Sequence, residues 1–198
     1  MRSQRRFGEY LPWALLLLLV AGYAALAPLT AGHDDKDWSH LWLGGRMVVA
    51  GRSADLYDPQ AQVAVYRQAD PNGNPPKVWA PRNDVLGCFN YPPPAALAYA
   101  TLAWLDMPTA AVVHAFLNVA VAVLVAFWFC RHVGRGEHGA TMALAVLAYP
   151  AFFVNLSIGQ NAVWSTSVGV VGGILIWRRL DLMGGVVLGL LCLKPNWL

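Results

Sequence analysis

The sequence predicts an all-α fold, a polytopic transmembrane helix bundle with one large extracytoplasmic loop that contains short helices. Hydrophobic residues make up 57% of the 198 residues and charged residues only 13%, too few charges to cover a soluble globule of this size. The charges lie in short clusters between long apolar runs, as in membrane proteins. The net charge of +3 forms no stripe suited to nucleic acid, so membrane lipids are the expected surroundings.

The first predicted span is the uncharged run from Tyr10 to Thr30, which as a helix would be about 31 Å long. Arg2, Arg5 and Arg6 precede it, and such basic flanks stay on the cytoplasmic side. A cleaved signal peptide is the alternative, but the run is longer than a usual signal-peptide core and more spans follow. We therefore expect a multi-pass protein of the plasma (inner) membrane with a cytoplasmic N-terminus.

Three later apolar segments predict further crossings, over Ala110–Cys130, Gly139–Asn155 and Ala162–Trp177. Basic clusters follow the first and the last of them and place those ends in the cytoplasm, which leaves Gly159–Asn161 at an outer turn. A further apolar run starts at Leu182 and has not crossed the hydrocarbon by Leu198. We therefore expect the chain to be the N-terminal portion of a longer protein.

The apolar stretch Pro93–Leu105 is treated separately, because a helix of that length measures only about 20 Å. If it crossed the bilayer, Arg131 would lie outside, against the positive-inside bias. We expect a re-entrant or interfacial helix that begins at the prolines Pro92 to Pro94.

The loop from Ala31 to Tyr91, within a single membrane domain over residues 1–198, holds most of the acidic residues. Asp37 lies where the first span leaves the bilayer, and a partly desolvated carboxylate there would have a raised pKa suited to accepting a proton. The alternative is a solvated cluster in which Asp37 caps a helix over Trp38–Ala50. Asp35 and Asp37 have an Asp-x-Asp spacing, but no further oxygen ligand is evident, so neither a metal nor a cofactor is predicted.

Polar residues within the apolar segments are candidates for binding. His114 and Asn118 share one helix face, which in lipid should look into the bundle. Gln160 and Asn161, at the outer turn, either satisfy backbone groups or bind a ligand. Lys194 would lie in the outer half of the bilayer, either near a lipid phosphate or extended to the interface.

Four stretches of the sequence carry a family resemblance: Asp37 through Gly51 to Leu56-Tyr57-Asp58-Pro59, Asn90-Tyr91-Pro92-Pro93-Pro94, Gly159-Gln160-Asn161, and Gly185 through Gly189 to Lys194-Pro195. Together they resemble glycosyltransferase family 87, a family of polyprenol-phosphate-dependent membrane enzymes with the GT-C architecture. Their order along the chain also agrees with the predicted topology, the first three lying outside and the last in an outward-running segment.

The resemblance implies an enzyme that moves a hexosyl group of the mannosyl type from a polyprenyl-phosphate sugar to a lipid or glycan acceptor at the outer face. By position, Asp37 would be the catalytic general base. Arg46 and Lys194 would offset the charge of the donor phosphate, and Gln160 and Asn161 would hydrogen-bond the sugar or phosphate. Family members continue with further spans after the Lys-Pro stretch, so activity of this 198-residue chain alone is in doubt.

A second hypothesis is a non-enzymatic membrane subunit or half of a transporter, in which His114, Asn118 and Lys194 would line a substrate path. Transporters commonly contain internal repeats, and none is visible in this sequence. The acidic residues also cluster in an outer loop and not at the midplane. The transferase is therefore the favoured hypothesis.

The predicted topology can be tested with single cysteines placed at Ser53, in the large loop, and at Gly136, between the second and third predicted spans. An impermeant maleimide added to intact cells should label the first and not the second, because the basic clusters keep Gly136 inside. Labelling at Gly136 in intact cells would reverse the assignment.

Overall fold

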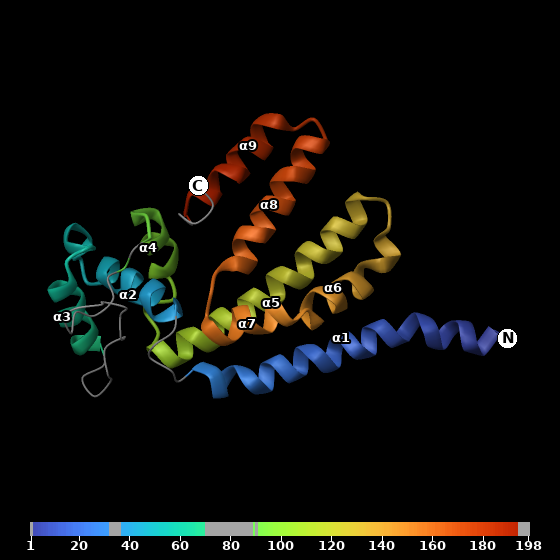
Figure 1. Cartoon of the computed structure of the whole chain (residues 1–198), viewed down its shortest axis with the longest axis horizontal. Coiled ribbons are helices and arrows are strands. Elements are labelled where there is room, and N and C mark those ends of the chain that lie inside the picture. Colours follow the sequence, from blue (N-terminus) through green and yellow to red (C-terminus); the bar gives the residue numbers. More distant parts are fainter. Residues whose placement is uncertain (1, 32–36, 70–88, 90, 194–198) are drawn as a thin grey trace. The chain divides into compact units, whose positions relative to one another are not determined.

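The structure, a computed structural model, describes residues 2–31, 37–69, 89 and 91–193 (Figure 1). Within these residues the fold is helical and contains no strand, which confirms the all-α prediction. The α-helices are α1 (Arg2–Ala31), α2 (Asp37–Val49), α3 (Pro59–Ala69), α4 (Pro93–Ala100), α5 (Met107–His132), α6 (Gly139–Ala148), α7 (Pro150–Ile158), α8 (Ala162–Trp177) and α9 (Asp181–Gly189), and short 3-10 turns cover Ser53–Asp55, Gly136–His138 and Leu190–Leu193.

Two of the described helices are long and apolar enough to cross a membrane by themselves. They are the stretch Tyr10–Pro28 of α1 and the whole of α5, which confirms an apolar helix of sufficient length at each of the first two predicted spans. Asp106 stabilises the start of α5, because the backbone N–H of Thr109 donates to its Oδ2 at 3.0 Å. Hydrogen bonds from the backbone and the side chain of Thr109 lower the pKa of the Asp106 carboxyl.

The predicted span Gly139–Asn155 is not one continuous helix. It is broken at Tyr149, whose backbone is extended (ψ 126°), and the two parts, α6 and α7, are bent by 59°. The cause is Pro150, which lacks a backbone N–H and disfavours helical geometry at the residue before it. The bent pair together is long enough to form a third span. The next predicted segment, Ala162–Trp177, is confirmed as α8.

Contacts within the described chain divide it into two compact units. The first comprises Met1–Leu29, Ala115–Ser157 and Asn161–Leu191, and the second comprises Thr30–His114, Ile158–Gln160 and Cys192–Leu198. The first contains most of the apolar helices that could cross the membrane, and the second contains the predicted outer loop.

Small residues let the helices of the first unit approach closely. α8 and α9 lie side by side (Figure 1), and a Cβ atom on Gly172 would lie 2.6 Å from Cγ of Leu188. At the far end of α8, Nη2 of Arg178 donates to the backbone carbonyl of His132 at 3.4 Å. The two basic clusters that predicted cytoplasmic turns therefore lie at the same end of this unit.

The second unit is built on the packing of α2 against α4. A Cβ atom on Gly45 would lie 2.6 Å from the carbonyl oxygen of Tyr99, so only glycine allows this approach. From the same helix, Nε1 of Trp42 donates to the carbonyl of Leu105 at 3.1 Å and Nη1 of Arg46 donates to that of Ala103 at 2.8 Å. α2 thus supplies side-chain donors to the carbonyls that follow the end of α4.

The prediction of one helix over Pro93–Leu105 is wrong in its length, since α4 ends at Ala100 and turns follow. The proline start is confirmed, with Pro92 at the N-cap and proline in the first turn. Eight helical residues span about 12 Å, well short of a bilayer. The interfacial or re-entrant location of this segment stays a prediction.

Replacing Gly45 with Ala should destabilise the protein by about 1–3 kcal/mol, because the new methyl group would meet backbone atoms of α4 that cannot move aside. Gly22→Ala is the matched control: Gly22 is also helical, but no atom lies within 4 Å of the place its new methyl group would take, so this change should be neutral or stabilising. Thermal unfolding in detergent micelles measures both, and equal stability of the two variants would contradict the close approach of α2 and α4.

Candidate functional site

The candidate site lies in the second unit, around the first turn of α2. Asp37 is the first residue of α2, and its side chain lies outside what the structure describes. The next residue, Trp38, is only 4% exposed. Its ring stacks on the imidazole of His114, with centroids 4.5 Å apart, and meets the ring of Tyr99 edge-on at 5.7 Å. Packing of Trp38 therefore fixes the backbone that carries Asp37.

The turn between α7 and α8 packs on the same tryptophan. Gly159 has a φ of +69°, and a Cβ atom there would collide with Cβ of Trp38. The position thus requires glycine both for its conformation and for space. The backbone of the next residue, Gln160, is hydrogen-bonded to the ring of His114. The Trp38 cluster, defined as Trp38, Tyr99, His114 and Gly159–Gln160, therefore joins the start of α2 to the turn between α7 and α8.

The Trp38 cluster is a neutral, largely buried environment. His114 is 3% exposed, and burial, with a smaller contribution from Tyr91, raises the pKa of the Tyr99 phenol, so this hydroxyl stays protonated. A carboxylate at the edge of such an environment would be partly desolvated, which is the condition that favours proton uptake.

Arg46 takes part in packing through one of its donors. Nη1 donates to the carbonyl of Ala103, and the guanidinium lies 5.9 Å from the ring centroid of Trp42. Because a guanidinium has five N–H donors, this contact leaves donors for a second partner. The proposed contact of Arg46 with a donor phosphate stays a prediction.

The remaining candidate residues differ in what the structure shows. Asn161 is the residue before α8 and belongs to the first unit. Its backbone carbonyl accepts from the N–H of Ser165 at 3.3 Å, whereas its Oδ1 atom is buried and has no hydrogen-bond partner among the described residues. Lys194 and Asp35 lie outside the described residues. His114 and Asn118 are both buried, 3% and 1% exposed, which confirms that their shared face looks inward.

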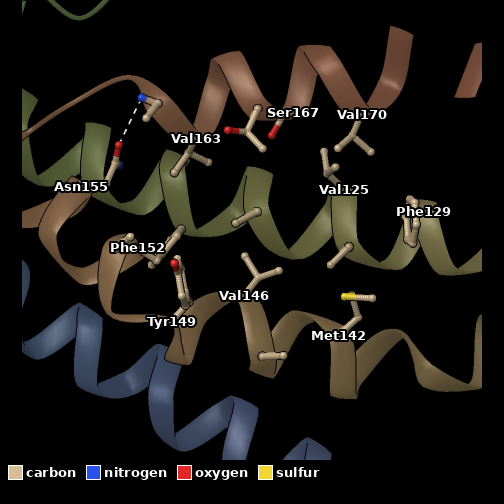
Figure 2. Close-up of a pocket in the computed structure, with 16 residues that line it drawn as sticks. Val125, Phe129, Met142, Val146, Tyr149, Phe152, Asn155, Val163, Ser167 and Val170 are labelled. Atoms are coloured by element: carbon tan, nitrogen blue, oxygen red, sulfur yellow. Dashed lines mark hydrogen bonds between the residues drawn. The ribbon is translucent and has the colours of Figure 1, made fainter. Parts of the chain in front are cut away.

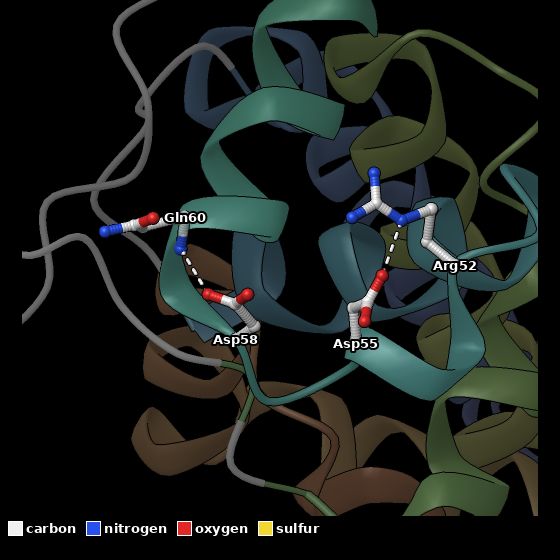
Figure 3. A network of polar contacts seen from close by, with 4 residues as sticks. All are labelled: Arg52, Asp55, Asp58 and Gln60. Atoms are coloured by element: carbon white, nitrogen blue, oxygen red, sulfur yellow. Dashed lines mark hydrogen bonds and ion pairs between the residues drawn. The ribbon is translucent and has the colours of Figure 1, made fainter.

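Two other acidic residues of the loop have local structural partners (Figure 3). Asp55 pairs with Arg52, with Oδ2 and Nε 2.6 Å apart at the surface. Asp58 caps α3, because its Oδ1 accepts from the backbone N–H of Gln60 at 2.9 Å. Pro59 follows at the first helical position, where its missing N–H costs nothing.

Further contacts tie together stretches that are separate in the sequence. The hydroxyl of Tyr57 donates to the carbonyl of Tyr91 at 2.9 Å. The buried amide of Gln62 donates to the carbonyl of Leu56 at 2.7 Å and accepts from the backbone N–H of Phe89 at 3.0 Å. The Leu56–Pro59 and Tyr91–Pro94 stretches are thus neighbours in this unit.

Trp38 and Tyr99 were not predicted from the sequence as parts of a site, and α3 was not predicted either. The Asp58-Pro59 pair is a helix-start signal that could have revealed α3. No local pattern could have revealed the Trp38 cluster, because its members come from α2, α4, α5 and the turn before α8.

The sequence pattern of glycosyltransferase family 87 matches residues 89–197. This match covers more than half of the chain and includes α4, α5, the turn at Gly159–Asn161 and the Lys194 segment. The chain belongs to glycosyltransferase family 87. The family assignment confirms the resemblance and indicates a glycosyltransferase, which acts on a sugar donor and an acceptor.

The family 87 match does not extend over α2, so Asp37 and Arg46 lie outside the matched residues whereas Gln160, Asn161 and Lys194 lie within them. The structure nevertheless places Trp38, next to Asp37, against Gly159 of the matched region. No curated protein and no solved structure matches the chain.

The contact between Gly159 and Trp38 predicts that Gly159→Ala is more harmful than the same change at Gly51. Both glycines have a φ of +69°, but a Cβ atom at Gly51 would have no neighbour within 4 Å. Each change costs about 1–2 kcal/mol for the left-handed backbone, and Gly159→Ala should lose about 1–3 kcal/mol more from the collision with Trp38. Thermal unfolding in detergent measures the difference. Equal losses of stability in the two variants would contradict the packing of Gly159 on Trp38.

Proposed function

We propose that this family 87 protein transfers a hexosyl group of the mannosyl type from a polyprenyl-phosphate sugar to a lipid or glycan acceptor at the outer face of the membrane. Its family is that of a glycosyltransferase, and its apolar helices are suited to a lipid-linked donor. The observation that carries the proposal is the contact between the first turn of α2 and the Gly159–Gln160 turn.

In the proposed reaction, Asp37 accepts the proton of the acceptor hydroxyl as that oxygen attacks the anomeric carbon of the donor sugar. The bond between the anomeric carbon and the phosphate oxygen breaks, and polyprenyl phosphate leaves with the electron pair. Attack opposite to the leaving group inverts the anomeric configuration. The proton removed from the acceptor stays on the carboxyl of Asp37 until it is released to water.

The other candidate residues would act on charge and orientation. Arg46 has donors that are not used by Ala103, and together with Lys194 it would offset the charge of the leaving phosphate. The backbone of Gln160 is hydrogen-bonded to His114, and its side-chain amide would hydrogen-bond the sugar or phosphate. Asn161 has a buried Oδ1 without a partner in the described chain, and this atom would accept a sugar hydroxyl.

The variant Asp37→Asn tests the general base. The amide has nearly the same shape but cannot accept the proton, so transfer should fall by about 10²- to 10⁴-fold while membrane insertion and donor binding persist. The measurement is turnover of polyprenyl-phosphate sugar in membranes that contain the expressed protein and a membrane lipid acceptor.

Asp58→Asn is the matched control, because it removes a carboxylate from the same loop while asparagine keeps the cap on α3. It should retain normal turnover, as should Asp34→Asn and Asp35→Asn. Normal turnover of Asp37→Asn would show that Asp37 is not the general base. Equal losses at Asp35 and Asp37, with rescue by Mn²⁺, would instead favour a metal-dependent mechanism.

A further inference from the structure

The first unit contains a cavity of about 650 Å³ between α5, α6, α7 and α8 (Figure 2). This volume is within the range of small-molecule sites. Its walls are mostly aliphatic and aromatic and carry no ionisable group other than the phenol of Tyr149; the walls include Ala122, Val125, Phe129, Met142, Val146 and Phe152. A cavity of this kind accepts hydrocarbon and does not favour a charged group.

One end of the cavity carries a buried amide with an unused donor. Asn155, which lines the cavity, is 7% exposed. Its Oδ1 accepts from the backbone N–H of Ala162 at 3.1 Å (Figure 2), and this bond holds the side chain in place. Its Nδ2 is buried and has no hydrogen-bond partner among the described residues. Because a buried N–H without an acceptor is costly, this end of the cavity favours a ligand with a neutral oxygen acceptor.

The cavity is elongated along the helix axes. Its lining on α8 runs from Ala162 to Val170, which is about 12 Å of helix. Figure 2 shows Asn155 near one end of this stretch and Phe129 and Val170 near the other. The shape suits a single hydrocarbon chain that carries its polar atom at the Asn155 end.

We propose that this cavity binds one acyl chain of an ester-linked membrane lipid, with the ester carbonyl accepting a hydrogen bond from Nδ2 of Asn155. An ester places a neutral acceptor directly at the head of a hydrocarbon chain, as the lining requires. A polyprenyl phosphate fits less well, since its polar group is an anion and no lysine, arginine or histidine lines the cavity. The proposal uses none of the catalytic residues and does not depend on the proposed reaction.

The test uses the protein in lipid nanodiscs that contain phosphatidylglycerol with a diazirine at the end of one acyl chain. After irradiation, peptide mapping should find adducts on the α5 and α8 residues that line the cavity. A second probe with the same chain in ether linkage lacks the carbonyl and should label these residues about three- to tenfold less, as expected for the loss of one hydrogen bond.

Two pairs of variants complete the test. Val125→Trp fills the cavity and should abolish the mapped adducts, whereas Leu124→Trp, on the exposed side of the same helix, should leave them unchanged. Asn155→Leu should remove the preference for ester over ether while some labelling persists. If Asn155→Leu does not fold, the Val125 and Leu124 pair still decides whether the cavity is occupied.

Three results would overturn the proposal. The first is equal labelling of Val125→Trp and Leu124→Trp, which would mean that the adducts arise outside the cavity. The second is equal labelling of wild-type protein by the ester and ether probes. The third is displacement of the probe by polyprenyl phosphate at lower concentrations than by unlabelled ester lipid, which would assign the cavity to a prenyl chain.

Discussion

The arrangement of the second unit depends on the close approach of Gly159 to Trp38. The turn between α7 and α8 must pass the tryptophan without a side chain, and its left-handed backbone at Gly159 adds a second reason for glycine. Once this turn is in place, Gln160 reaches the ring of His114. The contact therefore links the residue after Asp37 to a turn more than a hundred positions later in the chain, and it makes a shared site physically possible.

A second constraint acts two turns further along the same face of α2, where Gly45 permits contact with the backbone of α4. α4 ends at Ala100, and Trp42 and Arg46 donate to the carbonyls of Leu105 and Ala103 in the turns that follow it. Such side-chain donors replace hydrogen bonds that a longer helix would make with its own backbone. One face of α2 thus meets both the turn at Gly159 and the helix α4.

The elements that the sequence predicted well are those with strong local signals. α8 follows an asparagine and ends before a pair of arginines, and its predicted limits agree with the structure. The break at Tyr149 was missed because a single proline inside an apolar run changes hydropathy little while it interrupts helical hydrogen bonding. α4 was predicted too long for a similar reason. Thr101–Leu105 is apolar enough to continue a helix, but it forms turns.

The site residues also differ in how much of their role has a local signal in the sequence. Asp37 and Gln160 were candidates from their positions, and the family resemblance gave them roles. The packing around Trp38 gives them a physical connection that no spacing in the sequence contains. Arg46 illustrates why position alone does not assign a role. Its guanidinium stabilises the turn after α4 through the carbonyl of Ala103, so removing it would disturb packing and any phosphate contact together. A loss of activity would therefore not by itself identify a phosphate ligand. Gln160 differs, because its contact with His114 is made by the backbone and a change of its side chain would leave that contact intact.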